Sequence, residues 1–267
     1  MKKVIWSIVL SWVCLAFAAA GIGTRDAVSA CDGKVYKKGD KIMFGVPKVS
    51  GYLFVRTFTK DGKYEAILQI THGMVEFVER YRPFAEFLTE NGFMVVGHDH
   101  LGHGDSVASR EDWGYFAENP SDTVITDMHT LRTMVQKENP GVPYFMMGHS
   151  MGSYMLRKYL TIHNDDLRGA IIMGTGCVPD SMTRLGINVC RFLAKIFGWH
   201  HRSRLVESLS FGGPYKKYDL SGKTPSNSWL TKDEDIVKFY YNEPRCTFKF
   251  TLNGYLGLME AVFYDNQ

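Results

Sequence analysis

The stretch from Tyr144 to Ser153 reads YFMMGHSMGS, an apolar run that meets two glycines with Ser150 between them. The G-x-S-x-G pattern arises by chance in many chains, so its context decides how it is interpreted. Gly148 and Gly152 would let the backbone turn tightly between a strand and a helix. We predict a nucleophile elbow that presents Ser150 at the turn, and a glycine-flanked helix cap is the alternative.

The segment after Ser150 predicts the helix that such an elbow needs. In SMGSYMLRKYLTIH, the side chains of Met151, Met155 and Tyr159 are four residues apart and share one helical face. Tyr154 and Ile162 fill the same stripe. We expect this face of the helix to be buried.

The alternation of strand and helix extends in both directions along the chain. Short apolar runs at 66–70, 93–99, 142–148 and 167–174 have the composition of buried strands. An amphipathic segment follows each of the first three runs. Apolar strands that alternate with amphipathic helices specify a mostly parallel sheet with helices on both faces. The predicted fold class is therefore α/β.

Two helix starts are predicted from capping residues. Ser121 or Asp122 is expected to cap the helix that precedes the elbow strand. Later in the chain, Thr231 with Glu234 three residues on is typical of a capping box. Both predictions place a helix start at a polar side chain that can accept backbone hydrogen bonds.

The alternation of predicted strands and helices stops after Cys177. We assign residues 31–177 to an α/β core, 178–230 to an inserted helical cap, and 231–267 to a return into the core. The cap segment has helical patches, glycines and aromatic residues but no apolar run typical of a buried strand. We expect the sheet to lack its last strands, which would leave an apolar edge exposed and the final helix without a packing partner.

Residues 1–30 have the features of a signal peptide or membrane anchor. Lys2 and Lys3 precede the uncharged run VIWSIVLSWVCLAFAAAGIG at 4–23. A positive start, an apolar run and small residues are typical of an export signal, and the run could span a bilayer if retained. We expect an exported or membrane-anchored protein with membrane contact through residues 4–23. Lipidation at Cys31 and a cytoplasmic location are the alternatives.

Charge and composition exclude several other function classes. The chain has 31 basic and 28 acidic residues, and this small excess argues against nucleic acid as a partner. The five cysteines form no C-x-x-C pair, so free and largely buried thiols are expected. His98, His100 and His103 have irregular spacing on a loop, which favours a structural role over a zinc site. We predict no metal and no cofactor.

A serine nucleophile also needs backbone N–H groups that stabilise a tetrahedral intermediate. The amide of Met151, directly after the serine, is one candidate. The second is expected from the loop ITHGMVE, where Gly73 has no side chain that would hold the backbone away from the serine and Met74 offers its amide. The two methionine side chains would then be free to line an apolar acyl pocket.

Three motifs occur together: HGMVEFVERYRPFAEFLTENGFMVVGHDHLGHGDS at 72–106, GHSMGS at 148–153 and SWLTKDE at 228–234. Over residues 50–267, the chain resembles the monoacylglycerol lipase and lysophospholipase-like branch of the α/β-hydrolase superfamily. The resemblance implies a serine esterase that acts on glycerol or lysophospholipid esters, with a helical cap over an apolar acyl tunnel. It also implies that His72-Gly73 and Glu76 organise the oxyanion loop. The loop after the second core strand would be shaped by Asp99, Gly102, His103 and Gly104.

The order of the triad in this superfamily is serine, acid, histidine. After Ser150 the chain has His163, at the far end of the elbow helix, and His200 and His201 in the cap segment. None of these positions suits the catalytic base. The acid and the base are therefore expected beyond Gln267.

Two function classes remain open. The first is a serine-dependent carboxylic ester hydrolase that works through an acyl-enzyme on Ser150. The second is a catalytically impaired, truncated homologue that binds apolar ligands without turnover. A fold alone does not choose a reaction, so a peptidase or haloperoxidase also stays open. The sequence predicts neither the acyl chain length, nor the head group, nor the oligomeric state.

Overall fold

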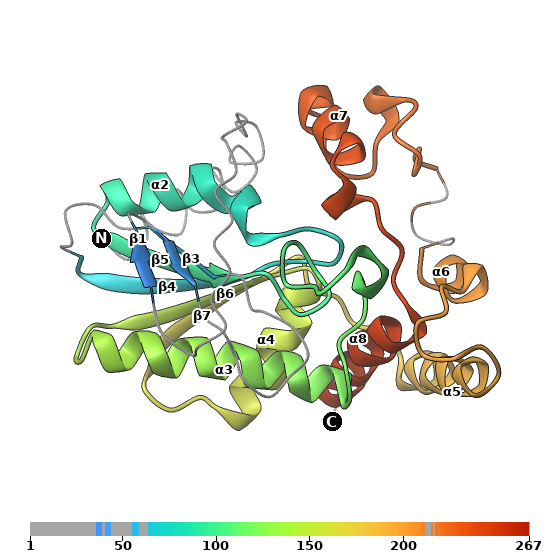
Figure 1. The fold of residues 1–267 in the computed structure, drawn as a ribbon, viewed down its shortest axis with the longest axis horizontal. Coiled ribbons are helices and arrows are strands. Elements are labelled where there is room, and N and C mark those ends of the chain that lie inside the picture. The colour runs from blue at the N-terminus through green and yellow to red at the C-terminus, as the bar shows by residue number, and fades with distance from the viewer. Residues whose placement is uncertain are drawn as a thin grey trace.

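The computed structural model describes residues 36–38, 41–43, 55–58, 64–211, 215 and 217–266. At its centre is a five-stranded sheet in the order β3-β5-β4-β6-β7 (Figure 1). The parallel strands are β4 (Ala66–Thr71), β5 (Phe93–His98), β6 (Tyr144–His149) and β7 (Leu167–Met173). Strand β3 (Val55–Phe58) pairs antiparallel with β5, and β1 (Tyr36–Lys38) pairs antiparallel with β2 (Lys41–Met43). The predicted α/β fold class is confirmed.

Helices cover both faces of this sheet. Figure 1 shows α2 (Arg82–Glu90) on one face and α3 (Pro120–Glu138) with α4 (Met151–Ile162) on the other. After β7 come α5 (Asp180–Phe197), α6 (Arg204–Phe211), α7 (Glu234–Asn242) and α8 (Leu252–Asp265). Short 3-10 turns lie at η2 (Val78–Tyr81), η3 (Arg110–Asp112), η4 (Pro225–Asn227) and η5 (Pro244–Cys246).

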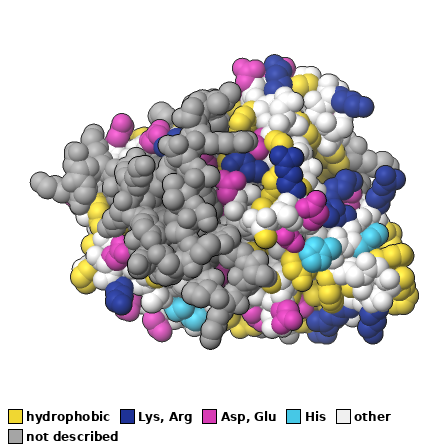
Figure 2. All heavy atoms as spheres, in the orientation of Figure 1, with side chains coloured by type: hydrophobic (Ala, Val, Ile, Leu, Met, Phe, Trp, Pro, Cys, Tyr) yellow, Lys and Arg dark blue, Asp and Glu magenta, His cyan; other side chains and the backbone are white. Residues whose placement is uncertain are grey.

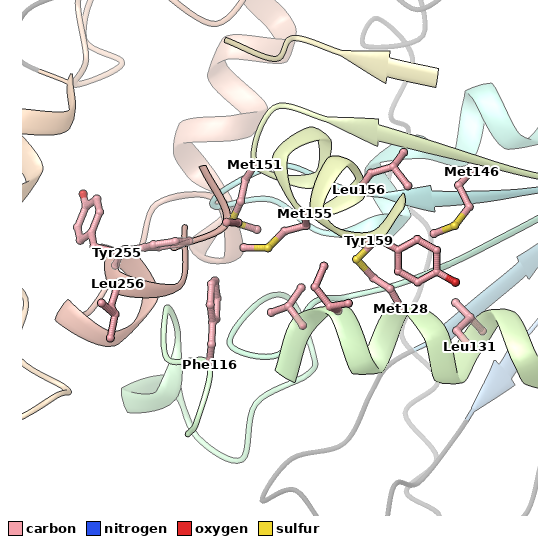
Figure 3. Close-up of a cluster of buried hydrophobic side chains, with 14 of the residues drawn as sticks. Phe116, Met128, Leu131, Met146, Met151, Met155, Leu156, Tyr159, Tyr255 and Leu256 are labelled. Carbon is pink, nitrogen blue, oxygen red and sulfur yellow. The ribbon is translucent and has the colours of Figure 1, made fainter. Parts of the chain in front are cut away.

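The main core lies between the sheet and the layer of α3, α4 and α8 (Figure 3). Met151, Met155 and Tyr159 of α4 are buried in it, which confirms the predicted apolar face of that helix. Tyr154 is half-buried, and Ile162 is 46% exposed, so the prediction was wrong for Ile162. Ile162 is the last residue of α4, and the stripe has left the packed part of the helix there.

The start of α3 differs from the prediction. The helix begins at Pro120, and Asn119 is its N-cap in a left-handed conformation with φ of 48°. Proline suits the first helical position because its fixed φ is already helical and its missing N–H is not needed there. Ser121 and Asp122 therefore lie inside the helix, and the prediction that one of them caps it was wrong.

The start of α7 also differs from the prediction. Its N-cap is Asp233, whose side chain accepts hydrogen bonds from the amides of Asp235 and Ile236. A carboxylate at this position satisfies two backbone donors and interacts favourably with the helix dipole. The capping box of Thr231 and Glu234 was therefore wrong, and Glu234 is the first helical residue.

Strand β7 forms one end of the described sheet, where it pairs with β6 alone. Its residues are half-exposed or exposed, so the prediction of a fully buried strand was wrong, whereas the predicted exposed apolar edge is confirmed. The final helix, α8, packs against α5, α4 and α3. The prediction that this helix has no packing partner was therefore wrong.

Helices α5 and α6 present apolar side chains to solvent. One face of α5 is buried, through Ile187, Cys190 and Ala194. Figure 2 shows hydrophobic and basic side chains beside one another in the region of α5 and α6. The large apolar residues on these two helices that are more than half exposed are Met182, Leu185, Phe192, Ile196, Phe197, Leu205 and Leu209.

Three of the cysteines lie in the described residues, and all three are free thiols. Cys190 and Cys246 are buried and Cys177 is exposed, which agrees with the expectation of free, largely buried thiols. The run at 4–23 and Cys31 lie outside the described residues. Within the part of the chain that is described, no helix combines the length and the apolar character needed to cross a membrane.

Asp127, on α3, makes stability depend on pH. Its side chain is buried, and burial raises its pKa to about 7. The folded state therefore binds a proton that the unfolded state releases between about pH 4 and pH 7, so this group stabilises the fold more as the pH falls. We expect Asp127→Asn to raise the free energy of unfolding, relative to wild type, by about 2 kcal/mol more at pH 8 than at pH 5. Urea denaturation at both pH values measures this difference, and equal effects would contradict the prediction.

Candidate active site

Ser150 lies at a sharp turn between β6 and α4. Its backbone has φ of 51° and ψ of −118°, a region that residues other than glycine rarely adopt. The amide of Ser150 donates a hydrogen bond to the carbonyl oxygen of Met173 on β7, at 2.9 Å. The predicted order of strand, turn and helix is confirmed. The side chain is neither fully buried nor fully exposed.

The two glycines of the motif are required by close backbone packing. A Cβ on Gly148 would lie 2.4 Å from the carbonyl oxygen of Gly152. A Cβ on Gly152 would lie 2.1 Å from the carbonyl oxygen of Thr71, at the end of β4. Both distances are far below van der Waals contact, and both involve backbone atoms that cannot rotate away. The turn therefore fits only with glycine at these positions.

The loop after β4 passes directly against Ser150. A Cβ on Gly73 would lie 3.2 Å from the Cβ of Ser150. His72 is buried, and its Nε2 accepts a hydrogen bond from the amide of His100 at 2.9 Å. Met74 follows Gly73, just as Met151 follows Ser150. The fold thus brings the two segments that carry the proposed oxyanion amides to the same place.

Glu76 connects this loop to the rest of the site. It is buried, and its carboxylate accepts hydrogen bonds from the amide of Gly73 and, at 2.9 Å, from the Tyr81 hydroxyl. It also forms a buried ion pair with Arg80 and lies 3.2 Å from Nδ1 of His149. Burial raises the pKa of Glu76, but Arg80 and His149 more than offset this and hold it well below its usual range. The side chain is therefore a fixed negative charge beside the elbow.

His149 precedes Ser150, and its ring belongs to the Glu76 network. Its Nδ1 lies 3.1 Å from the hydroxyl of Tyr81 as well as 3.2 Å from the carboxylate of Glu76. This role of Arg80, Tyr81 and His149 is not among the expectations drawn from the sequence. The spacing of Glu76 and Arg80, four residues apart, was the available signal, because charges at this spacing pair on a helical turn.

His98, the last residue of β5, and His100 and His103 in the loop that follows it are buried and neutral. His98 and His100 have ring centroids 4.9 Å apart, and burial lowers the pKa of His98 to about 3. Asp99 accepts hydrogen bonds from the amides of Val78 and Asp105, at 2.7 and 2.9 Å. It therefore ties this loop to η2. Among the described residues, no group of three or more His, Cys, Asp or Glu side chains is arranged to hold a metal ion.

The histidines that follow Ser150 make contacts elsewhere. His163 stacks on His129 with ring centroids 3.8 Å apart, at the end of α4 that is remote from Ser150. His200 stacks on Tyr115, at 3.9 Å, and His201 stacks on Phe197. A helix with the length of α4 separates its two ends by roughly 18 Å. These contacts agree with the expectation that His163, His200 and His201 do not act as the catalytic base for Ser150.

A mostly parallel sheet with helices on both faces and a strained serine turn at the carboxyl end of a central strand defines an α/β hydrolase. The model of the family described as serine aminopeptidase, S33, matches residues 62–264. The chain belongs to this family.

Curated relatives include several lipases. The chain is 34% identical to the monoglyceride lipase of Homo sapiens over 108 residues, which are 38% of this chain and 32% of that protein. It is 30% identical to the monoglyceride lipase homolog of Monkeypox virus over 149 residues, which are 54% of this chain and 51% of that protein. The matches thus cover about a third to a half of the length of these relatives.

Solved structures have the same fold over more of the chain. A thermostable carboxyl esterase from Bacillus coagulans, in complex with glycerol, superposes with a TM-score of 0.71 and is 28% identical. That likeness covers 86% of this chain and 71% of the esterase. A soluble variant of monoglyceride lipase from Saccharomyces cerevisiae has a TM-score of 0.58 and covers 91% of this chain and 71% of its own, but at 17% identity it supports the fold alone.

Proposed function

We propose that the protein is a serine-dependent carboxylic ester hydrolase that acts on monoacylglycerol- or lysophospholipid-like esters through an acyl-enzyme on Ser150. The observation that carries the proposal is the strained turn of Ser150 with the Gly73 backbone packed against it. Such a turn projects the hydroxyl group away from the backbone, and the neighbouring loop can offer N–H groups where negative charge develops.

The proposed reaction has two stages. The Oγ of Ser150 attacks the ester carbonyl carbon, and the amides of Met74 and Met151 stabilise the resulting oxyanion. When the tetrahedral intermediate collapses, the bond to the alcohol oxygen breaks, and the alcohol leaves with a proton. Water then hydrolyses the acyl-enzyme, which releases the fatty acid and restores the serine.

The reaction also needs a general base for the serine proton. His149 is an unsuitable candidate because it adjoins Ser150 at the strained turn and its Nε2 lies near Gly174, where a Cβ would be 3.6 Å from it. The later histidines of this chain lie in other contacts. No acid or base is therefore assigned among the described residues, and their location after Gln267 stays a prediction.

Three observations support a lipid ester as the substrate class. Met151 is buried in the main apolar cluster and Met74 packs against it, so the side chains beside the proposed oxyanion amides are apolar and adaptable. The exposed apolar residues of α5 accompany the exposed basic side chains Arg184 and Lys195, and Arg191, which pairs with Glu260, as expected of a surface that meets anionic lipid. The monoglyceride lipases among the relatives favour an ester over a peptide substrate.

Turnover by this chain tests the proposal. The hydrolysis of a short-chain acyl ester and of a monoacylglycerol would be measured for residues 1–267 and for a form extended through the downstream reading frame. We expect the extended form to be at least about 10⁴-fold faster, because the loss of a triad member typically costs that much in kcat.

The Ser150→Ala variant is the control for both forms. Turnover by residues 1–267 that Ser150→Ala abolishes would show that a base lies within these residues and would contradict the predicted location of the base. A lack of turnover by the extended form would favour the alternative, a protein that binds apolar ligands without chemistry.

A further inference from the structure

Val75 adopts a backbone conformation that its side chain disfavours. It lies between Met74 and Glu76 in the loop that passes Ser150, and its φ is 55°. A β-branched residue at positive φ is strained, and such strain persists only where neighbouring contacts hold it. The contacts of Val75 therefore matter for the position of the Met74 amide.

One of these contacts comes from α7. The hydroxyl of Tyr240 donates a hydrogen bond to the carbonyl oxygen of Val75, at 3.2 Å, although the two residues are 165 positions apart in the sequence. Tyr240 is buried and packs in a small apolar cluster with Phe77 and Cys246. The bond therefore joins two well-packed segments rather than a loose side chain and a loop.

A second connection runs from the same tyrosine to Glu76. The guanidinium of Arg80 lies over the ring of Tyr240, 5.2 Å from its centroid. Arg80 pairs with Glu76, and Glu76 accepts a hydrogen bond from the amide of Gly73. Tyr240 thus contacts the carbonyl of the strained residue directly, and it contacts Arg80, the ion-pair partner of the carboxylate that holds Gly73.

We propose that Tyr240 is a positioning residue that couples the docking of α7 to the geometry of the oxyanion loop. This inference rests on the proposed function, because it concerns the amide of Met74. When α7 is docked, the Tyr240 hydroxyl holds Val75 in its left-handed conformation. When α7 moves away, Val75 relaxes and the Met74 amide leaves its position. The position of α7 is therefore linked to the geometry of the Met74 amide.

Four variants test this coupling. Tyr240→Phe removes the hydroxyl and keeps the ring that packs against Arg80. Tyr241→Phe is the matched control, because the Tyr241 hydroxyl accepts a hydrogen bond from Trp229 Nε1 at 3.1 Å. Val75→Gly removes the strain, since glycine adopts positive φ readily. The fourth variant combines Tyr240→Phe with Val75→Gly.

Two measurements apply to each variant. Amide hydrogen exchange of residues 73–76 reports the loop directly and requires no activity. The rate of modification of Ser150 by a p-nitrophenyl alkylphosphonate, followed by p-nitrophenol release, reports the oxyanion site. We expect Tyr240→Phe to speed exchange and to slow modification by about fivefold each, the effect of one buried hydrogen bond. Tyr241→Phe should change neither the exchange rate nor the modification rate. In the Val75→Gly background, the effect of Tyr240→Phe on each rate should fall below about twofold.

Unchanged exchange at 73–76 in Tyr240→Phe would overturn the inference, as would an equal change in Tyr241→Phe or an undiminished effect in the Val75→Gly background. The exchange measurement separates this inference from the proposed function. If Ser150 is not modified at all in the wild-type form extended through the downstream reading frame, the proposed function fails, whereas the exchange data still decide whether Tyr240 holds the loop.

Discussion

Gly152→Ala is expected to lower the free energy of unfolding by about 3 kcal/mol and to abolish modification of Ser150. The added methyl group would lie 2.1 Å from the carbonyl oxygen of Thr71 and 2.5 Å from that of His72. Both atoms belong to the backbone where β4 enters the oxyanion loop, so either the loop or the start of α4 must shift. Urea denaturation followed by circular dichroism measures the first effect, and phosphonate labelling measures the second.

Gly169→Ala, on β7, is the matched control for this substitution. Its new Cβ would lie 3.2 Å from a ring carbon of Phe145, a side chain that can give way. We expect this variant to stay within about 0.5 kcal/mol of wild type and to react normally at Ser150. A Gly152→Ala variant that behaves like Gly169→Ala would contradict the close backbone packing of the elbow.

Glu76→Gln should be the most damaging substitution in the charged network. Glu76 and Arg80 form an ion pair with side chains that are only 4% and 6% exposed. Removing one partner of a buried pair costs about 3 kcal/mol or more, because the remaining charge has lost the group that neutralises it. Glu76 also positions Gly73, so we expect slower modification of Ser150. Chemical denaturation gives the stability and phosphonate labelling gives the reactivity.

Two further variants serve as controls for Glu76→Gln. Glu86→Gln makes the same change in an exposed ion pair with Arg82, at 3.4 Å, and should have little effect. Glu76→Gln combined with Arg80→Met removes both charges and should recover part of the lost stability. A single Glu76→Gln variant that is as stable as Glu86→Gln would show that the buried pair is not important for the fold.

The elbow was predictable because its determinants are adjacent in the sequence. The apolar run, Gly148, Ser150 and Gly152, and the amphipathic segment that follows specify a strand, a turn and a helix by local rules. The loop at Gly73 was predictable for a related reason. In a parallel sheet, the loops that follow neighbouring strands meet at one edge, and β4 is the neighbour of β6.

The contacts that hold this loop were not predictable. Glu76 meets His149 across 73 positions, and Tyr240 meets Val75 across 165 positions. No local pattern identifies partners at such separations. The apolar run of β7 by itself predicts burial, whereas its half-exposed character follows from its place at the end of the described sheet. The start of α7 was missed because Asp233 and Thr231 are both acceptable caps, and only the backbone geometry chooses between them.

The central claim is that Ser150 is a nucleophile at a formed oxyanion site. The most direct test is to treat the form extended through the downstream reading frame, and its Ser150→Ala variant, with a fluorophosphonate and to map the adduct by peptide mass spectrometry. We predict one phosphonyl adduct on the peptide that contains Ser150 and none on the corresponding peptide of Ser150→Ala. An unmodified Ser150, or an adduct elsewhere that persists in Ser150→Ala, would contradict the claim.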